Sequence, residues 1–135
     1  MTTTLDLTRH VDVPREKAWQ AWTDPERLMA WWWHTVPTTR IAADARVGGH
    51  YRFENPDFGV TGEYLEVVEN ERLVFTWRWI EDSIETAETD TVTVTFIEAE
   101  GGTDVSVHHP TGESNAEPYE IGWRDTLRGL DQGVA

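Results

Sequence analysis

The feature that most restricts the fold is a series of segments in which apolar and polar residues alternate, followed by one long helical segment. Residues 60–68, 73–80, 91–99 and 103–109 carry this two-residue period, which is typical of strands buried on one face. Two of the three intervals between them are short turns, so neighbouring strands are expected to be antiparallel. A long sheet with one apolar face curls and needs a cover, and residues 114–132 form the only later segment long enough to provide it.

The first part of the chain has a different pattern. Residues 3–13 alternate as a half-buried strand, and Pro14 then opens a helix where its missing N–H costs nothing. Residues 23–28 start a second short helix with capping-box spacing. Further strands are expected from Ile41 and over residues 50–54. Because strands and helices are segregated along the chain, the predicted fold class is α+β rather than α/β.

Length and composition narrow the function classes. A chain of 135 residues suits a single domain spanning residues 1–135. The absence of cysteine excludes disulfides, thiolate metal sites and a cysteine nucleophile. A net charge of -14 repels phosphate backbones and anionic lipids, so neither a nucleic acid nor a membrane partner is expected. With no signal peptide and no apolar run of spanning length, the expected location is cytoplasmic.

Five segments carry a family resemblance: VDVPREKAWQAWTDPERLMAWWWHT (11–35), VGGHYRF (47–53), GEYLEVVENERLVFTW (62–77), TVTVTFIEAEGGTDVSV (91–107) and GWRDTLRGL (122–130). In this order they resemble the START/Bet v 1-like superfamily and most closely its AHSA1-type branch, named for similarity to the C-terminal domain of the Hsp90 ATPase activator. The resemblance implies a helix-grip fold, in which a curved antiparallel sheet of about six or seven strands surrounds the C-terminal helix and two short helices follow the first strand. The sequence departs from the usual pattern at Trp33 and His34, where Gly and Pro are common.

Three consecutive tryptophans, Trp31–Trp33, end the second short helix. Neither a helix nor a strand can direct three consecutive side chains to one face. We therefore expect one to seal the core, another to face the cavity, and the third to lie half-exposed at the cavity mouth. Trp32 continues the helical stripe of Leu28 and Met29 and is the predicted sealing residue, while Trp33 is the predicted rim residue.

The other candidate ligand-binding residues are mostly aromatic. The strand 73–80 places Phe75, Trp77 and Trp79 on its inward face, where they either line a pocket or fill the core. His34 is a candidate polar anchor, or else an ordinary surface or core residue. The predicted ligand-binding set is Trp31, Trp33, His34, Tyr51, Phe53, Phe75, Trp77, Trp79, Tyr119 and Trp123.

No motif predicts a catalytic residue, a metal site or a cofactor. His108 and His109 are adjacent on a strand and so point to opposite faces, which prevents them from chelating one metal. The glycine pairs match no phosphate-binding or dinucleotide fingerprint. Glu63 and Glu66 occupy strand positions where one could face inward and act as a base.

Three hypotheses of function follow. The first is a binding protein for an apolar or aromatic small molecule in a tryptophan-lined cavity. The second, from the superfamily, is a cyclase- or hydrolase-like enzyme that uses His34 or a buried glutamate as acid or base. The third is a protein-interaction module for an Hsp90-type chaperone, which rests on the resemblance alone. The sequence leaves open whether the protein is a monomer or a homodimer.

Overall fold

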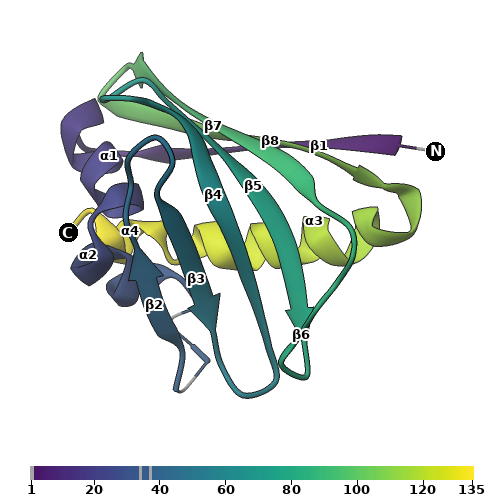
Figure 1. The fold of residues 1–135 in the computed structure, drawn as a ribbon. Coiled ribbons are helices and arrows are strands. Elements are labelled where there is room, and N and C mark those ends of the chain that lie inside the picture. Colours follow the sequence, from purple (N-terminus) through teal and green to yellow (C-terminus); the bar gives the residue numbers. More distant parts are fainter. Residues whose placement is uncertain (1, 34, 37) are drawn as a thin grey trace.

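The computed structural model describes residues 2–33, 35–36 and 38–135. One antiparallel sheet and four helices make up this part of the chain (Figure 1). The elements are β1 (Thr2–Val11), α1 (Arg15–Thr23), α2 (Pro25–Trp31), β2 (Arg40–Ala43), β3 (His50–Glu54), β4 (Phe58–Val68), β5 (Arg72–Glu81), β6 (Ile84–Glu85), β7 (Asp90–Ala99), β8 (Gly102–Gly112), α3 (Glu113–Arg128) and α4 (Leu130–Gly133).

The sheet has the strand order β1-β8-β7-β5-β4-β3-β2, and the short β6 pairs with β5 outside this path. β1 and β2 therefore form the two edges, and α1 and α2 connect them. Figure 1 shows α3 running across one face of the curved sheet, with α1, α2 and α4 gathered near its C-terminal end. This is the predicted α+β class, with the C-terminal helix as the cover.

The curvature has a local cause in β4. The pairing of β4 with β5 shifts register between Tyr64 and Glu66, as in a β-bulge. At Gly62 the two strands come so close that an added Cβ would lie 1.9 Å from the carbonyl oxygen of Thr76. A side chain there would push the strands apart, so glycine permits the bend that wraps the sheet around α3.

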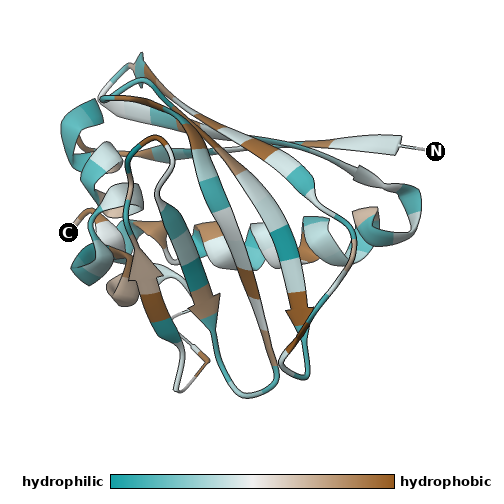
Figure 2. Ribbon diagram, in the orientation of Figure 1, coloured by the Kyte–Doolittle hydropathy of each residue, from teal (hydrophilic) through white to brown (hydrophobic). Residues whose placement is uncertain are grey.

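The alternating pattern produces the expected two-faced strands, and Figure 2 shows it as bands of contrasting hydropathy along the sheet. From Leu73 to Trp77 in β5 and from Val92 to Phe96 in β7, the inward positions are buried and their neighbours are more exposed. The pattern reverses at the end of β5, where Trp79 is half-buried and Ile80 is fully buried. The predicted single helix over residues 114–132 is interrupted at Gly129, which separates α3 from α4. Glycine is a poor helix former, and the short α4 packs back against α2.

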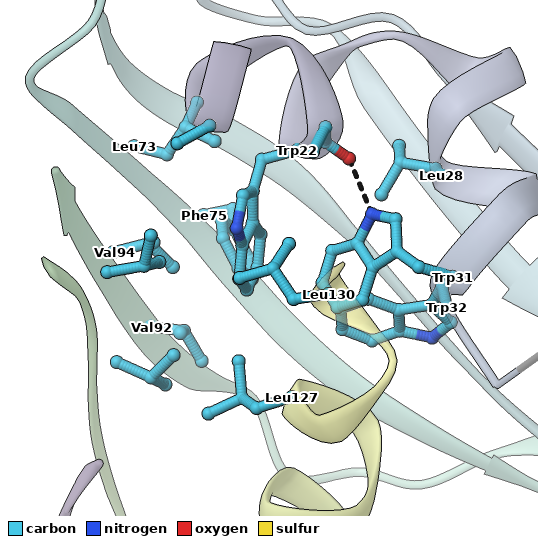
Figure 3. Close-up of a cluster of buried hydrophobic side chains, with 14 of the residues drawn as sticks. Trp22, Leu28, Trp31, Trp32, Leu73, Phe75, Val92, Val94, Leu127 and Leu130 are labelled. Atoms are coloured by element: carbon cyan, nitrogen blue, oxygen red, sulfur yellow. Dashed lines mark hydrogen bonds between the residues drawn. The ribbon is translucent and has the colours of Figure 1, made fainter. Parts of the chain in front are cut away.

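Trp31 and Trp32 are both buried, and Trp31 is the one that packs between the helices. Its side chain is fully buried, and its Nε1–H donates to the carbonyl oxygen of Ala21 at 2.7 Å (Figure 3). That carbonyl lacks a helical partner because the residue four positions later is Pro25, which has no N–H. On the other side, a Cβ added to Gly133 would lie 2.2 Å from Cδ1 of Trp31. Trp31 thus joins α1, α2 and α4.

Trp32 is buried as predicted, but the predicted helical stripe of Leu28, Met29 and Trp32 extended the helix by one residue too many. α2 ends at Trp31, and Trp32 has an extended backbone with φ -69° and ψ 116°. The buried stripe therefore joins Leu28 to Trp31, three residues later, rather than to Trp32. Met29, which was assigned to the same stripe, is 60% exposed.

Candidate ligand-binding groove

An open groove of about 330 Å³ lies between the end of β5 and α3. Ligand sites for small molecules usually have volumes of several hundred Å³ and mostly apolar walls. β5 supplies every second residue at its end, and α3 supplies residues spaced three and four apart, so each element presents one face. The lining residues are Trp32, Trp33, Trp77, Trp79, Glu81, Asn115, Pro118, Tyr119, Gly122, Trp123 and Thr126.

Aromatic rings meet around this groove at steep angles. Tyr119 of α3 stands edge-on to Trp77, with ring centroids 5.9 Å apart and an interplanar angle of 82°. It also stands edge-on to Trp79, at 5.8 Å and 60°. Trp33 approaches Trp79 from the other side at 6.0 Å and 73°. These contacts fix the rings relative to one another, so the groove is bounded by a preformed aromatic wall.

A second, more open hollow of about 620 Å³ continues from the groove. The two share Trp33, Trp79, Gly122 and Thr126. Trp33 is half-buried and borders both spaces, which is the rim position predicted for it. The other residues of the hollow are Thr35, Val36, Phe58, Asp125 and Arg128.

His109 supports the groove wall through hydrogen bonds to Asp90 and Trp123. Its fully buried ring lies between Asp90 and Trp123, with Nε2 2.9 Å from Oδ2 of Asp90 and Nδ1 2.9 Å from Nε1 of Trp123. An indole N–H can only donate, so Nδ1 must be the acceptor and Nε2 must carry the proton that is donated to Asp90. Thr111 donates a further hydrogen bond to Oδ2 of Asp90. Trp123 is thereby oriented toward the groove by a chain of hydrogen bonds.

The hydrogen bonds and the burial of His109 agree on its charge state. Burial lowers the pKa of His109, while the hydrogen bond and charge of Asp90 oppose this shift. A protonated ring would lose its acceptor for the Trp123 N–H, so the structure fits the neutral form. The sequence analysis predicted that His108 and His109 point to opposite faces, without saying which of the two faces inward. His108 points outward and bonds Asp6, as that reasoning required.

Tyr119 lies in a negative electrostatic environment at the groove. Its pKa is raised first by burial and then by the charges of Asp90, Glu88 and Glu81. Glu81 belongs to the groove itself, where its carboxylate accepts a hydrogen bond from Nε1 of Trp79. The groove therefore combines apolar rings with negative charge at its margin.

The predicted ligand-binding residues divide into four groups. Trp33, Trp77, Trp79, Tyr119 and Trp123 line the groove. The others lie elsewhere: Tyr51, Phe53 and Phe75 at a closed end of the interior where only about 10 Å³ is free, Trp31 in the core between the helices, and His34 outside the described residues.

Six of the eleven lining residues are absent from the predicted set, and two of them bear on the sequence reasoning. Trp32 was assigned to core sealing; it is buried, as that role requires, and it also borders the groove. Glu81 lies one residue beyond the predicted end of its strand, although the parity of Trp77 and Trp79 extends to it. Continuing the alternation by one step would have found it.

Neither glutamate that was considered as an inward-facing base reaches the interior. Glu63 lies on the outer face of the sheet beside Arg78, and Glu66 is exposed and pairs with Arg72. The register shift in β4 leaves Tyr64, not a carboxylate, on the buried side. Within residues 2–33, 35–36 and 38–135, no group of three or more histidine, aspartate or glutamate side chains could hold a metal ion.

Residues 12–135 match the family described as activator of Hsp90 ATPase homolog 1-like protein. The chain belongs to this family. A comparison of this chain with curated proteins gave no significant match. None of the helices in the described chain has the length and apolarity needed to cross a membrane.

Solved structures show the same helix-grip fold as this AHSA1-like chain. A protein from Rhizobium leguminosarum has a TM-score of 0.82 at 21% identity, over 99% of this chain and 95% of that one. CalU16 from Micromonospora echinospora has a TM-score of 0.78 at 21% identity, over 99% and 77% of the two chains. DynU16, a protein of the dynemicin biosynthetic locus, has a TM-score of 0.79 at 21% identity; 95% of this chain matches 45% of its length. Identities this low establish the fold alone.

Proposed function

We propose that the protein binds a small apolar or aromatic molecule in the groove between β5 and α3. The observation that carries this proposal is the contrast between two aromatic regions of the interior. Around Tyr51, Phe53 and Phe75 the rings fill their space to within about 10 Å³. Along the groove, five tryptophans and one tyrosine border about 330 Å³. A ring-shaped ligand there would gain roughly 25 cal/mol for each Å² of apolar surface removed from water.

The enzyme hypothesis has less support. Glu81 and Tyr119 are the ionisable side chains among the described lining residues. The buried His109 already uses both of its ring nitrogens, one toward Asp90 and one toward Trp123. It is therefore a structural support of the wall rather than an available acid or base.

Gly122 offers a direct test, because it borders the groove and a side chain added there would extend into open space. A Cβ added there meets no atom within 4 Å. Gly122→Phe should plug the groove without disturbing the fold, and the helix should gain about 0.5 kcal/mol because glycine is the weaker helix former. Ile121→Phe is the matched control, since Ile121 is the next residue of α3, is 55% exposed and does not border the groove.

The probe is N-phenyl-1-naphthylamine, a neutral aromatic dye whose fluorescence rises in apolar surroundings. The wild-type protein and Ile121→Phe should bind the dye with similar affinity, and Gly122→Phe should bind it at least tenfold more weakly. Equal dye binding by all three proteins, or none by the wild type, would refute the groove as the ligand site. Thermal melts of the three proteins verify that they are folded.

A further inference from the structure

We infer that the groove selects an organic cation, of the quaternary-ammonium or protonated-amine class, over neutral and anionic ligands of the same shape. The inference rests on the proposed function, since it names the ligand class of the same groove. It is carried by the combination of steeply inclined aromatic rings and a carboxylate at the margin.

Several aromatic rings of different orientation border the groove. A cation is attracted to the face of an aromatic ring, most strongly to tryptophan. Trp77 and Trp79 are nearly parallel, at 23°, and form one side of the groove wall. Tyr119 stands at 82° to Trp77 and 60° to Trp79, and Trp33 stands at 73° to Trp79, so the wall presents rings of more than one orientation to the groove.

A carboxylate is fixed at the margin of this aromatic wall. Oε2 of Glu81 accepts the hydrogen bond of the Trp79 indole, which ties the negative charge to the aromatic wall. Glu81 is the only residue with a formal charge at neutral pH among the described residues that line the groove. A ligand cation that enters here would find its counter-charge already in place.

Charges farther from the groove favour the same ligand class. Glu88 is held near the start of α3 by a hydrogen bond from Asn115, which itself lines the groove. The positive charge of Arg128, at the adjoining hollow, is compensated by Asp125 at 2.9 Å. The whole chain carries a net charge of -14. Anionic ligands would therefore be repelled both locally and at a distance.

The test compares two ligands of nearly identical shape. Phenyltrimethylammonium and tert-butylbenzene differ in that the first has a positively charged nitrogen where the second has a carbon. Each is used to displace N-phenyl-1-naphthylamine from the wild-type protein, which gives two dissociation constants. We expect the cation to bind at least tenfold more tightly, and its advantage to shrink as the salt concentration rises.

Two charge variants test whether Glu81 causes the preference for the cation. Glu81→Gln keeps an oxygen that can accept the Trp79 hydrogen bond but removes the charge, so it should reduce the ratio of the two affinities about fivefold or more. Glu98→Gln changes the net charge equally at an exposed position of β7 outside the groove lining, and should leave the ratio near the wild-type value.

The outcomes separate this inference from the proposed function. If tert-butylbenzene displaces the dye as well as the cation does, or if Glu81→Gln and Glu98→Gln change the ratio equally, the cation selectivity is refuted while the binding groove stands. If the wild type binds neither the dye nor either ligand, the proposed function fails and the inference fails with it.

Discussion

Replacing Trp31 by alanine tests how the tryptophan run is divided between core and groove. The variant removes a fully buried indole and the hydrogen bond that it donates to Ala21. Removing a large aromatic side chain from a packed core costs about 3–5 kcal/mol. The carbonyl of Ala21 would also lose its partner, because Pro25 cannot supply one, and that adds about 1 kcal/mol or more.

A total of this size is a large fraction of the stability of a small domain, typically about 5–15 kcal/mol. Urea unfolding followed by circular dichroism measures the loss without relying on the fluorescence of the residue that was removed. Trp31→Phe should lie between the wild type and Trp31→Ala, because it keeps a ring but not the donor. Trp33→Ala should lose only about 1 kcal/mol, since Trp33 is half-buried. An equal or larger loss in Trp33→Ala than in Trp31→Ala would show that the core assignment is wrong.

Two further predictions concern backbone conformation and pH. Trp33 has φ 47°, in the left-handed region that glycine adopts freely. Trp33→Gly should therefore be more stable than Trp33→Ala by about 1 kcal/mol in urea unfolding. A less stable Trp33→Gly would contradict this reasoning. Burial lowers the pKa of His109 from 6.5, so this histidine binds a proton more readily in the unfolded chain than in the folded protein. The free energy of unfolding should therefore decrease as the pH falls below about 6.5. His109→Gln replaces the ring by an amide that has a donor and an acceptor but does not titrate in this range. It should flatten the dependence of the urea midpoint on pH between pH 7.5 and pH 5.5, and an unchanged dependence would remove His109 as its source.

The sequence predicted the fold more completely than the groove. The fold is indicated by residues close together in the sequence, whereas the groove depends on contacts between distant segments. Alternation and capping are local signals, and they identified most strands and the starts of the helices. The end of α2 was misplaced by one residue, so the buried position in the helical stripe was assigned to Trp32 instead of Trp31, although both are buried. Consecutive residues at a helix end change direction sharply, and periodicity alone does not tell where the helix stops.

The division of the aromatic residues into filled core and open groove depends on contacts between distant segments. Phe75 and Trp77 share one face of β5, yet Phe75 meets Tyr51 of β3 and Trp77 meets Trp123 of α3. Strand parity gives them the same prediction, and only the position of the covering helix separates them. The link from Asp90 through His109 to Trp123 likewise joins three elements, so the sequence could indicate that His108 and His109 face opposite ways but not what His109 would contact.

The indole N–H signals of the eight tryptophans test the central claim most directly. In a ¹H–¹⁵N spectrum recorded during titration with N-phenyl-1-naphthylamine, each tryptophan reports on its own surroundings. The account predicts that the signals of Trp32, Trp33, Trp77, Trp79 and Trp123, which border the groove, shift together and saturate, while those of Trp19, Trp22 and Trp31 shift little. Larger shifts at Trp19, Trp22 and Trp31 than at the groove tryptophans, or no saturable shift at any of the eight, would contradict it.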